Sequence, residues 1–227
     1  MKARLVIPAA GMGRRLGLDI PKALAPLAGK PLIVRAVEGM GDAPFLAPVV
    51  IAVPAGWEKQ FAEALRSVET ATQLVTGGSD RQASVRRALA ALDEDAEIVA
   101  IHDAARPFAP VSAVIKAIEA ARAYGGATLA TPASDTILLD DGDGFLESTP
   151  DRAHAWACQT PQAFQVDVIR RAHEQAAREG RAFTDDATLA RHAGCKVKLV
   201  DGGPGNFKIT TARDFSFAAY LLEHDLI

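Results

Sequence analysis

The feature that most constrains the fold of this chain is an alternation of short β-branched runs with longer segments of helical period. Such alternation is typical of a parallel sheet with helices packed on both of its faces. The predicted strands span residues 4–8, 48–54, 73–76, 97–101, 127–131 and 196–200. The predicted helices span residues 31–40, 81–92 and 184–193. An apolar stripe through residues 111–118 predicts another helix, and a capping box of Thr211 and Asp214 opens the last one. We therefore expect an α/β fold.

Length and charge limit what such a fold can do. The chain has 227 residues, 49% of them hydrophobic, which suits a single domain over residues 1–227 with a sizeable core. Its net charge of -3 provides no basic field for a polyanion, so we expect no nucleic acid as partner. Cys158 and Cys195 lie far apart without a CxxC pattern, which argues against a disulfide framework and a structural zinc site.

The N-terminus indicates neither export nor membrane insertion. Its apolar run, in MKARLVIPAAG, is broken by Pro8 and Gly11 before it reaches the length of a signal sequence or a membrane span. We therefore expect a cytoplasmic protein with no membrane partner.

Residues 133–157 interrupt the alternation and predict a β-hairpin arm that stands off the main sheet. The segment contains the apolar run TILL, the turn-forming run DDGDG and a polar return. Hydrophobic residues on such an arm, among them Ile137, Leu138, Leu139 and Phe145, need to be covered. A second copy of the chain would cover them, so we expect a homodimer formed through the arm.

The first candidate site is the glycine-rich loop PAAGMGRR at residues 8–15, directly after a predicted strand. Small residues let backbone N–H groups approach a phosphate, and Arg14 or Arg15 adds positive charge. The loop lacks the third glycine of a dinucleotide fingerprint and is no Walker A sequence, so a plain turn remains an alternative. Lys22 follows in PKAL, where a solvated lysine is the alternative to a phosphate ligand.

Two further polar loops follow predicted strands, at the sheet edge where open α/β folds bind ligands. In GGSDRQAS, at residues 77–84, Ser79 or Asp80 could equally serve only to cap the next helix. In HDAARPF, at residues 102–108, an acidic and a basic residue stand together at a strand exit, which suits a metal-bound phosphate beside a sugar. We interpret His102 as a hydrogen-bonded structural residue, because no partner for a catalytic triad is present.

Shorter polar segments complete the set of candidates. They are Asp135–Thr136, Asp151–Arg152, Gln159–Gln162, Thr184–Asp185 and Asn206–Thr210. Taken singly, Thr184 fits a helix cap and Lys208 fits a strand end, so only the joint occurrence of these segments points to a function.

Together, the motifs LVIPAAGMGRRL, IPKAL, GGSDRQASV, HDAARPF, SDT, TPQ, TDDA and NFKIT resemble the cytidylyltransferases that act on 2-C-methyl-D-erythritol 4-phosphate. They recur in order from Leu5 to Thr210, which covers nearly the whole chain. The resemblance implies a modified Rossmann-like nucleotidyltransferase sheet with a protruding arm. It also implies transfer of a cytidylyl group from CTP, with Mg²⁺ or another divalent cation, in the non-mevalonate route to isoprenoid precursors.

The resemblance also implies roles for individual residues. It implies nucleotide binding by Ala9, Ala10, Gly11, Gly13, Gly78, Ser79, Ser84, Asp103 and Ala104. It implies catalysis by Arg15, Lys22 and Lys208. It implies binding of the second substrate by Asp103, Arg106, Thr136, Arg152, Thr184 and Lys208, with Thr136 and Arg152 reaching the partner's site. Asp103 is the candidate magnesium ligand, the ion being held mostly by CTP phosphates.

The chemistry of such a transfer agrees with this residue set. The nucleophile is a phosphate monoester oxygen that is already anionic near neutrality, so the reaction needs no general base. The demand on the site is to neutralise two anions and to align an in-line attack at the α-phosphorus. Arg15, Lys22 and Lys208 suit that demand.

Three other functions remain possible at this stage. A cytidylyltransferase for another polyol phosphate, such as ribitol 5-phosphate, shares most of the motifs; the HDAARPF form favours methylerythritol phosphate. A non-catalytic nucleotide sensor could dispense with Lys22 or Lys208, whereas this chain has both. A nicotinamide oxidoreductase is disfavoured by the missing GxGxxG motif.

Overall fold

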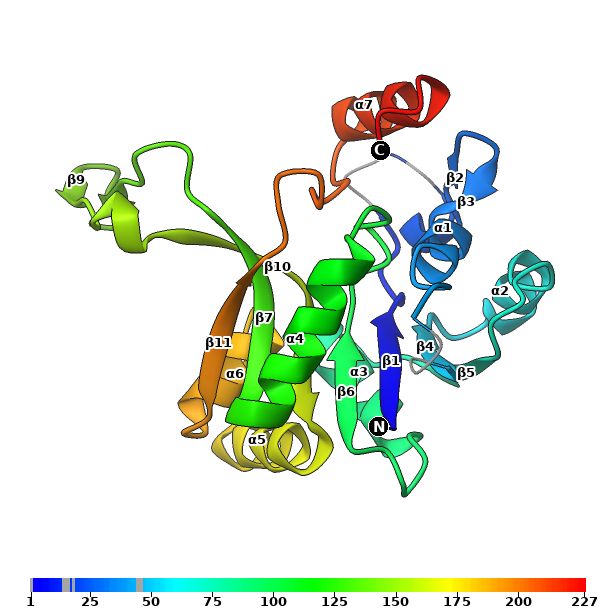
Figure 1. Ribbon diagram of the computed structural model, residues 1–227, viewed down its shortest axis with the longest axis horizontal. Helices are drawn as coiled ribbons and strands as arrows, with labels where there is room; N and C mark the ends of the chain where they lie inside the picture. The colour runs from blue at the N-terminus through cyan, green and yellow to red at the C-terminus, as the bar shows by residue number, and fades with distance from the viewer. Residues whose placement is uncertain (1, 14–16, 18, 44–46) are drawn as a thin grey trace.

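The computed structural model describes residues 2–13, 17, 19–43 and 47–227 (Figure 1). The strands are β1 (Ala3–Pro8), β2 (Pro26–Leu27), β3 (Lys30–Pro31), β4 (Val49–Val53), β5 (Thr72–Thr76), β6 (Ile98–Ile101), β7 (Gly125–Pro132), β8 (Leu139–Asp140), β9 (Leu146–Ser148), β10 (Trp156–Gln165) and β11 (Lys196–Asp201). The α-helices are α1 (Leu32–Glu38), α2 (Glu58–Ala64), α3 (Arg81–Ala90), α4 (Val111–Tyr124), α5 (Val166–Glu179), α6 (Asp186–His192) and α7 (Ala212–Glu223). Within the described residues, two short 3₁₀ turns, η2 (Lys22–Leu24) and η4 (Arg152–His154), accompany them.

Within the described residues, the main sheet has seven strands in the order β11-β7-β10-β6-β1-β4-β5. Strand β1 pairs in parallel with β4 and β6, β4 with β5, and β7 with β11. Strand β10 runs antiparallel to both β6 and β7. The carboxyl ends of the parallel strands therefore meet at one edge of the sheet, where α/β folds place their ligands.

Two hydrophobic layers cover the faces of the sheet, because side chains alternate along each buried strand. In β1, Leu5 and Ile7 pack in the layer formed with α1, α2 and α4, whereas Val6 packs in the layer formed with α3, α5 and α6. The neighbouring strand β4 repeats the alternation, with Ile51 in the first layer and Val50 in the second. Figure 1 shows α4 crossing one face of the sheet while α5 and α6 lie on the other.

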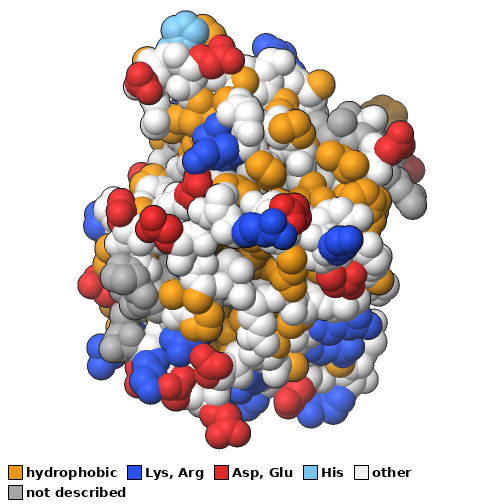
Figure 2. Space-filling model, turned by 90° about the vertical axis from the view of Figure 1, so that its right-hand side faces the viewer, with side chains coloured by type: hydrophobic (Ala, Val, Ile, Leu, Met, Phe, Trp, Pro, Cys, Tyr) orange, Lys and Arg blue, Asp and Glu red, His pale blue; other side chains and the backbone are white. Residues whose placement is uncertain are grey.

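A third, smaller hydrophobic cluster packs α7 near the edge of the sheet where the carboxyl ends of the parallel strands meet. Leu27, Leu32, Ile209 and Ala218 form its buried centre. Helix α7 opens with the predicted capping box, in which Thr211 and Asp214 each bond the other's backbone N–H. In Figure 2, hydrophobic side chains reach the surface in the upper half of the viewed face, the end of the molecule where α7 lies in Figure 1.

The arm is a hairpin that stands away from the sheet, as Figure 1 shows around β9. Strands β8 and β9 pair antiparallel across the turn-forming DDGDG run. The hydrophobic residues of the arm, Ile137, Leu138, Leu139, Phe145 and Leu146, are between 40% and 72% exposed in the single chain. The arm therefore adds little to the core of its own chain.

The structure confirms the α/β fold class and places an element on every predicted strand and helix, with ends that differ by a few residues. It adds elements that the hydrophobic pattern did not predict: the small β2–β3 hairpin, α2, β10 and α5. The predicted parallel sheet is thus interrupted by the antiparallel β10, which follows directly after the arm. Within the described part of the chain, no helix is long and apolar enough to cross a membrane.

Candidate active site

Two adjoining pockets open at the carboxyl edge of the sheet. The first, of about 360 Å³, is lined by Pro8, Ala9, Gly11, Gly13, Lys22, Ala23, Leu32, Arg81, Asp103, Ala104, Ala105, Lys208 and Thr210. The second, of about 230 Å³, is lined by Arg81, Asp103, Arg106, Cys158, Gln159, Thr160, Gln162, Thr184, Asp185 and Lys208. Arg81, Asp103 and Lys208 line both, so these three charged residues form the wall between the two pockets.

The glycine-rich loop after β1 forms one side of the first pocket. The backbone N–H of Lys22 donates to the Gly11 carbonyl at 3.1 Å, which folds η2 back over the loop. Gly13 has a φ of +65°, and a Cβ at this position would lie 2.8 Å from the Cβ of Lys22. Glycine at this position therefore lets Lys22 approach the loop closely and line the pocket.

The second predicted loop abuts the first, since a Cβ on Gly77 would lie 2.6 Å from the Cβ of Ala10. Ser84 is buried, accepts from the Gly78 N–H at 3.0 Å and donates to the Asp80 carbonyl at 2.8 Å. Asp80 caps α3 by accepting from the Ala83 N–H at 2.8 Å. The capping interpretation thus holds for Asp80, while the exposed Ser79 contacts its carboxylate at 2.9 Å.

A group of three charges, Arg81, Asp103 and Lys208, lies at the centre of the site. The Nε of Arg81 donates to Asp103 Oδ1 at 3.2 Å, and the Nζ of Lys208 donates to Asp103 Oδ2 at 2.6 Å. Burial alone would raise the pKa of Asp103, but the Arg81 and Lys208 cations outweigh it and hold this pKa well below its ordinary value. Asp103 is therefore an anion at neutral pH with both oxygens in charge-assisted hydrogen bonds.

Lys208 reaches Asp103 because the segment before it is held against β10. The buried Asn206 donates from Nδ2 to Gln159 Oε1 at 3.0 Å and to the Thr160 carbonyl at 2.9 Å. Gln159 in turn donates to the Gly203 carbonyl at 2.9 Å. The TPQ and NFKIT motifs, distant in sequence, thus form one hydrogen-bonded unit.

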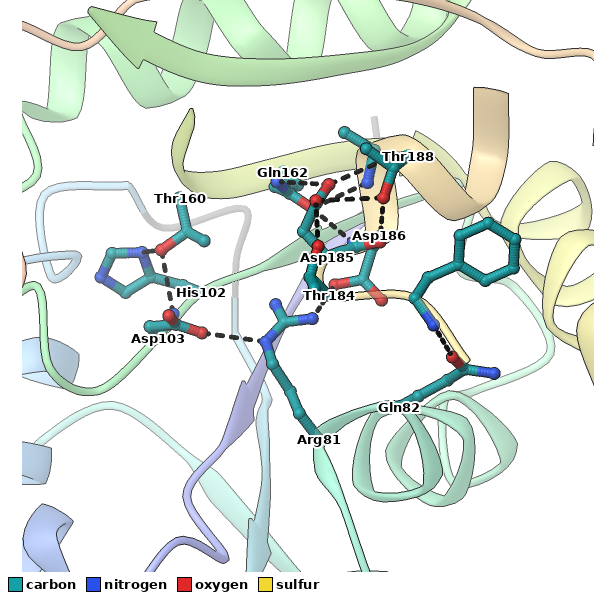
Figure 3. Close-up of polar contacts among 12 residues, drawn as sticks. Arg81, Gln82, His102, Asp103, Thr160, Gln162, Thr184, Asp185, Asp186 and Thr188 are labelled. Atoms are coloured by element: carbon teal, nitrogen blue, oxygen red, sulfur yellow. Dashed lines mark hydrogen bonds and ion pairs between the residues drawn. The ribbon is translucent and has the colours of Figure 1, made fainter. Parts of the chain in front are cut away.

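His102 is a hydrogen-bonded structural residue, as the sequence predicted. It is fully buried, with Nε2 at 2.9 Å from the Arg106 carbonyl and Nδ1 at 3.1 Å from Thr160 Oγ1 (Figure 3). Burial lowers the pKa of His102 to about 4, so the ring is neutral at physiological pH. With both ring nitrogens bonded inside the protein, His102 is not placed to take a proton from a substrate.

Besides Asp103 and Lys208, two further candidates for substrate binding, Arg106 and Thr184, line the second pocket, and they differ in which side-chain donors are already bonded within the protein. The guanidinium of Arg106 donates to the Asn206 carbonyl at 2.6 Å and to the Cys158 carbonyl at 3.1 Å. Thr184 is exposed and donates to Asp185 Oδ2 at 3.2 Å, while Asp185 is the residue that caps α6. Arg106 therefore braces the wall of the pocket, and Thr184 presents its side chain at the rim.

The remaining candidates lie elsewhere. Thr136 and Arg152 are exposed on the arm and line neither pocket of their own chain. Arg15 lies outside the described residues. Among the residues that are described, no group of three or more His, Cys, Asp or Glu side chains is placed to hold a metal ion.

Three polar residues of the site, Arg81, Gln162 and Asp186, lie in the candidate segments GGSDRQAS, Gln159–Gln162 and TDDA, but no role of their own was predicted for them. Arg81 binds Asp103 and, through Nη1, Asp186 Oδ2 at 2.7 Å. Gln162 Oε1 accepts from the Asp186 N–H at 2.8 Å. The available signal was Arg81 itself, because a cation on the first residue of a helix opposes the helix dipole and needs a partner.

The Rossmann-like sheet, its glycine-rich loops and two charged pockets at the carboxyl edge define an α/β nucleotidyltransferase. The sequence model of the 2-C-methyl-D-erythritol 4-phosphate cytidylyltransferase family matches residues 3–224. The chain therefore belongs to that family.

Individual relatives agree with this assignment. The chain is 41% identical over 221 residues to the 2-C-methyl-D-erythritol 4-phosphate cytidylyltransferase of Symbiobacterium thermophilum, covering 97% of this chain and 93% of the relative. Among solved structures, the 4-diphosphocytidyl-2C-methyl-D-erythritol synthase of Anaerococcus prevotii is similar with a TM-score of 0.87, 29% identity and coverage of 97% of this chain and 98% of that one. The enzyme from Thermus thermophilus gives a TM-score of 0.81, 33% identity and coverage of 98% and 100%.

Proposed function

We propose that this protein transfers the cytidylyl group of CTP to 2-C-methyl-D-erythritol 4-phosphate and releases pyrophosphate, a step in isoprenoid precursor synthesis. Family membership supports the reaction. The observation that carries the mechanism is the charged wall of Arg81, Asp103 and Lys208 between two pockets. One pocket would hold the triphosphate and the other the acceptor phosphate, so the two reacting groups would meet at this wall.

The mechanism we infer relies on positioning and charge neutralisation. The acceptor phosphate supplies an anionic oxygen that attacks the α-phosphorus, and pyrophosphate leaves from the opposite side. Lys22 and Lys208 offset the charge of the two phosphate groups, which would otherwise repel each other. No side chain has to remove a proton, which agrees with the buried, internally bonded state of His102.

In the proposed complex, the nucleotide lies in the first pocket and extends over the adjoining segment of residues 77–84, of which Arg81 lines the pocket. Ala9, Ala10, Gly11, Gly13 and Ala104 offer backbone and small side chains beside Lys22 for the phosphates and ribose. Gly78, in the turn before α3, and Ser84, in the first part of α3, would face the cytosine, with Ser79 near the ribose. Arg15 belongs to the same proposed phosphate-binding loop.

The acceptor would occupy the second pocket, where Arg106, Thr184 and Lys208 lie. Thr136 and Arg152 would complete it from a second subunit, since on their own chain they stand on the arm, away from the pocket. The exposed apolar side chains of the arm support a homodimer formed through this hairpin, because an isolated chain would leave them in water.

Magnesium fits this site as an ion held mainly by the nucleotide. It keeps waters and substrate phosphates as most of its ligands and needs few protein carboxylates. Asp103 would be its protein ligand, because each carboxylate oxygen has a second lone pair beyond the bond it already accepts. When bound, the ion would supply charge neutralisation to the triphosphate.

We further propose that the protein acts in the cytoplasm. Cys158 and Cys195 are free thiols, as is usual in a reducing compartment.

Pyrophosphate release tests the proposed reaction. The protein is offered CTP and Mg²⁺ with methylerythritol phosphate or ribitol 5-phosphate, and ATP, GTP and UTP serve as nucleotide controls. Release that requires both CTP and methylerythritol phosphate is expected. Release with ribitol 5-phosphate alone would reassign the acceptor, and absence of release with every pair would favour a nucleotide sensor.

A further inference from the structure

Arg81 lies between two carboxylates that come from different parts of the fold (Figure 3). Its Nε bonds Asp103 Oδ1 at 3.2 Å, and its Nη1 bonds Asp186 Oδ2 at 2.7 Å. Arg81 opens α3, Asp103 follows β6 and Asp186 opens α6. The guanidinium therefore joins three elements at one point of the site.

Asp186 does not touch either pocket. Its side chain is 1% exposed, its backbone N–H is held by Gln162, and His173 Nε2 lies 3.4 Å from its Oδ1. A buried carboxylate is costly unless it is paired, so Asp186 depends on Arg81 for its charge balance. Burial alone would raise the pKa of Asp186, but Arg81, together with the nearby His173, outweighs it and lowers this pKa below its ordinary value.

The position of Asp103 depends on this arrangement. One oxygen bonds Arg81 and the other bonds Lys208, while its backbone N–H donates to Thr160 Oγ1 at 3.0 Å. If Arg81 lost its hold on Asp186, its guanidinium could rotate, and the Asp103 carboxylate would follow it. Because Asp103 and Lys208 line both pockets, the two phosphate groups would then no longer be aligned.

We propose that Arg81 is a positioning residue that fixes the Asp103 carboxylate at the wall between the pockets, and that the buried Asp186 acts on the reaction only through Arg81. This inference rests on the proposed function, since it concerns the alignment of the same two phosphate groups. Asp186 thereby affects catalysis without contacting a substrate.

A double-mutant cycle separates this role from ordinary stabilisation. The variants are Arg81→Met, Asp186→Asn and the double variant, each measured for kcat, for KM toward both substrates, for CTP affinity by calorimetry and for thermal unfolding. A misplacement of about 1 Å can cost about 100-fold in rate, so we expect Arg81→Met to lower kcat by about 100-fold with a smaller change in KM. Asp186→Asn should cost at least about tenfold in kcat alone and nothing further when Arg81 is already Met.

Two further variants serve as controls, one for the loss of an arginine from α3 and one for the loss of the positive charge. Arg86→Met removes an exposed arginine from the same helix and should match the wild type. Arg81→Lys keeps the charge and should recover at least about tenfold of the kcat lost in Arg81→Met, although a single ammonium cannot bond both carboxylates as the guanidinium does. If Arg81→Met does not fold, the cycle is run with Arg81→Lys.

Each result has one meaning. Additive losses in kcat, or a wild-type kcat in Arg81→Met, would overturn the positioning role. Inactivity of the wild type and of Arg86→Met with every substrate pair would instead refute the proposed function, while CTP affinity would still show whether the variants bind nucleotide.

Discussion

Acidification should destabilise this protein through His102. The ring is fully buried, and its two nitrogens already contact the Arg106 carbonyl and Thr160 Oγ1. Burial places its folded-state pKa at about 4, against 6.5 for an ordinary histidine. Between these values the unfolded chain binds more protons than the folded one, so stability falls as the pH falls.

The size of this effect follows from the two pKa values. For a single group with these constants, the contribution lost between about pH 7.5 and about pH 4.5 is about 2 to 3 kcal/mol. Carboxylates whose pKa is lowered in the fold, such as Asp103 and Asp186, act in another window. Their stabilisation is present above the ordinary value of 3.8 and is lost as the pH falls below it.

Urea unfolding followed by circular dichroism across this pH range measures the effect, with His102→Gln as the reference. The glutamine amide can still donate to the Arg106 carbonyl but does not ionise, so the difference in unfolding free energy between the two proteins should change by about 2 to 3 kcal/mol toward acid pH. Parallel stability curves, or a wild type that gains stability in acid, would refute the reasoning. His102→Gln should also keep turnover at neutral pH if the ring is not catalytic.

Three further predictions address the site and the arm. Replacing Lys22 or Lys208 with Ala should abolish turnover and leave the circular dichroism spectrum unchanged; near wild-type rates in either variant would contradict the charge-neutralisation mechanism. Gly78→Ala would place a Cβ 2.4 Å from that of Ala83, and the forced shift of the turn should weaken CTP binding by about tenfold in calorimetry; unchanged affinity would show that the turn does not contact the nucleotide. Phe145→Glu, on the exposed arm, should convert a dimer into a monomer in light scattering, whereas a monomeric wild type or a dimeric variant would refute the arm interface.

The hydrophobic pattern sufficed to predict the parts of the fold in which each strand buries both faces. Leu5 and Val6 lie on opposite faces of β1, yet both are fully buried, so the run reads as continuously apolar. The glycine-rich loop after β1 was also predictable, because small residues directly after a buried strand let backbone N–H groups approach a ligand phosphate. Lys22, Asp103 and Lys208 were expected at the site and do line the first pocket.

Strand β10 and helix α5 were not predicted, but only β10 lacks a local hydrophobic pattern. Strand β10 contains Gln159 and Gln162, which are polar yet buried because their amides bond residues far along the chain. No local pattern reports such partners. Helix α5 did carry a signal, since Val166, Ile169, Ala172 and Ala176 recur at helical spacing and are buried on one face.

The Arg81–Asp186 pair was inaccessible for another reason. The two residues are 105 positions apart in sequence, so although a cation on the first residue of α3 needs a partner, no local pattern identifies Asp186 as that partner. An aspartate in a first helical turn needs no further explanation, so only the tertiary structure shows that Asp186 is buried and paired with Arg81.

The most direct test of the mechanism follows the attacking oxygen. Methylerythritol phosphate labelled with ¹⁸O on its phosphate is allowed to react with CTP, and the products are examined by ³¹P NMR and mass spectrometry. Direct attack of the phosphate oxygen at the α-phosphorus predicts that the label occupies the bridge of the new diphosphate and that the pyrophosphate carries none. Label in the pyrophosphate, or an unlabelled bridge, would contradict the account.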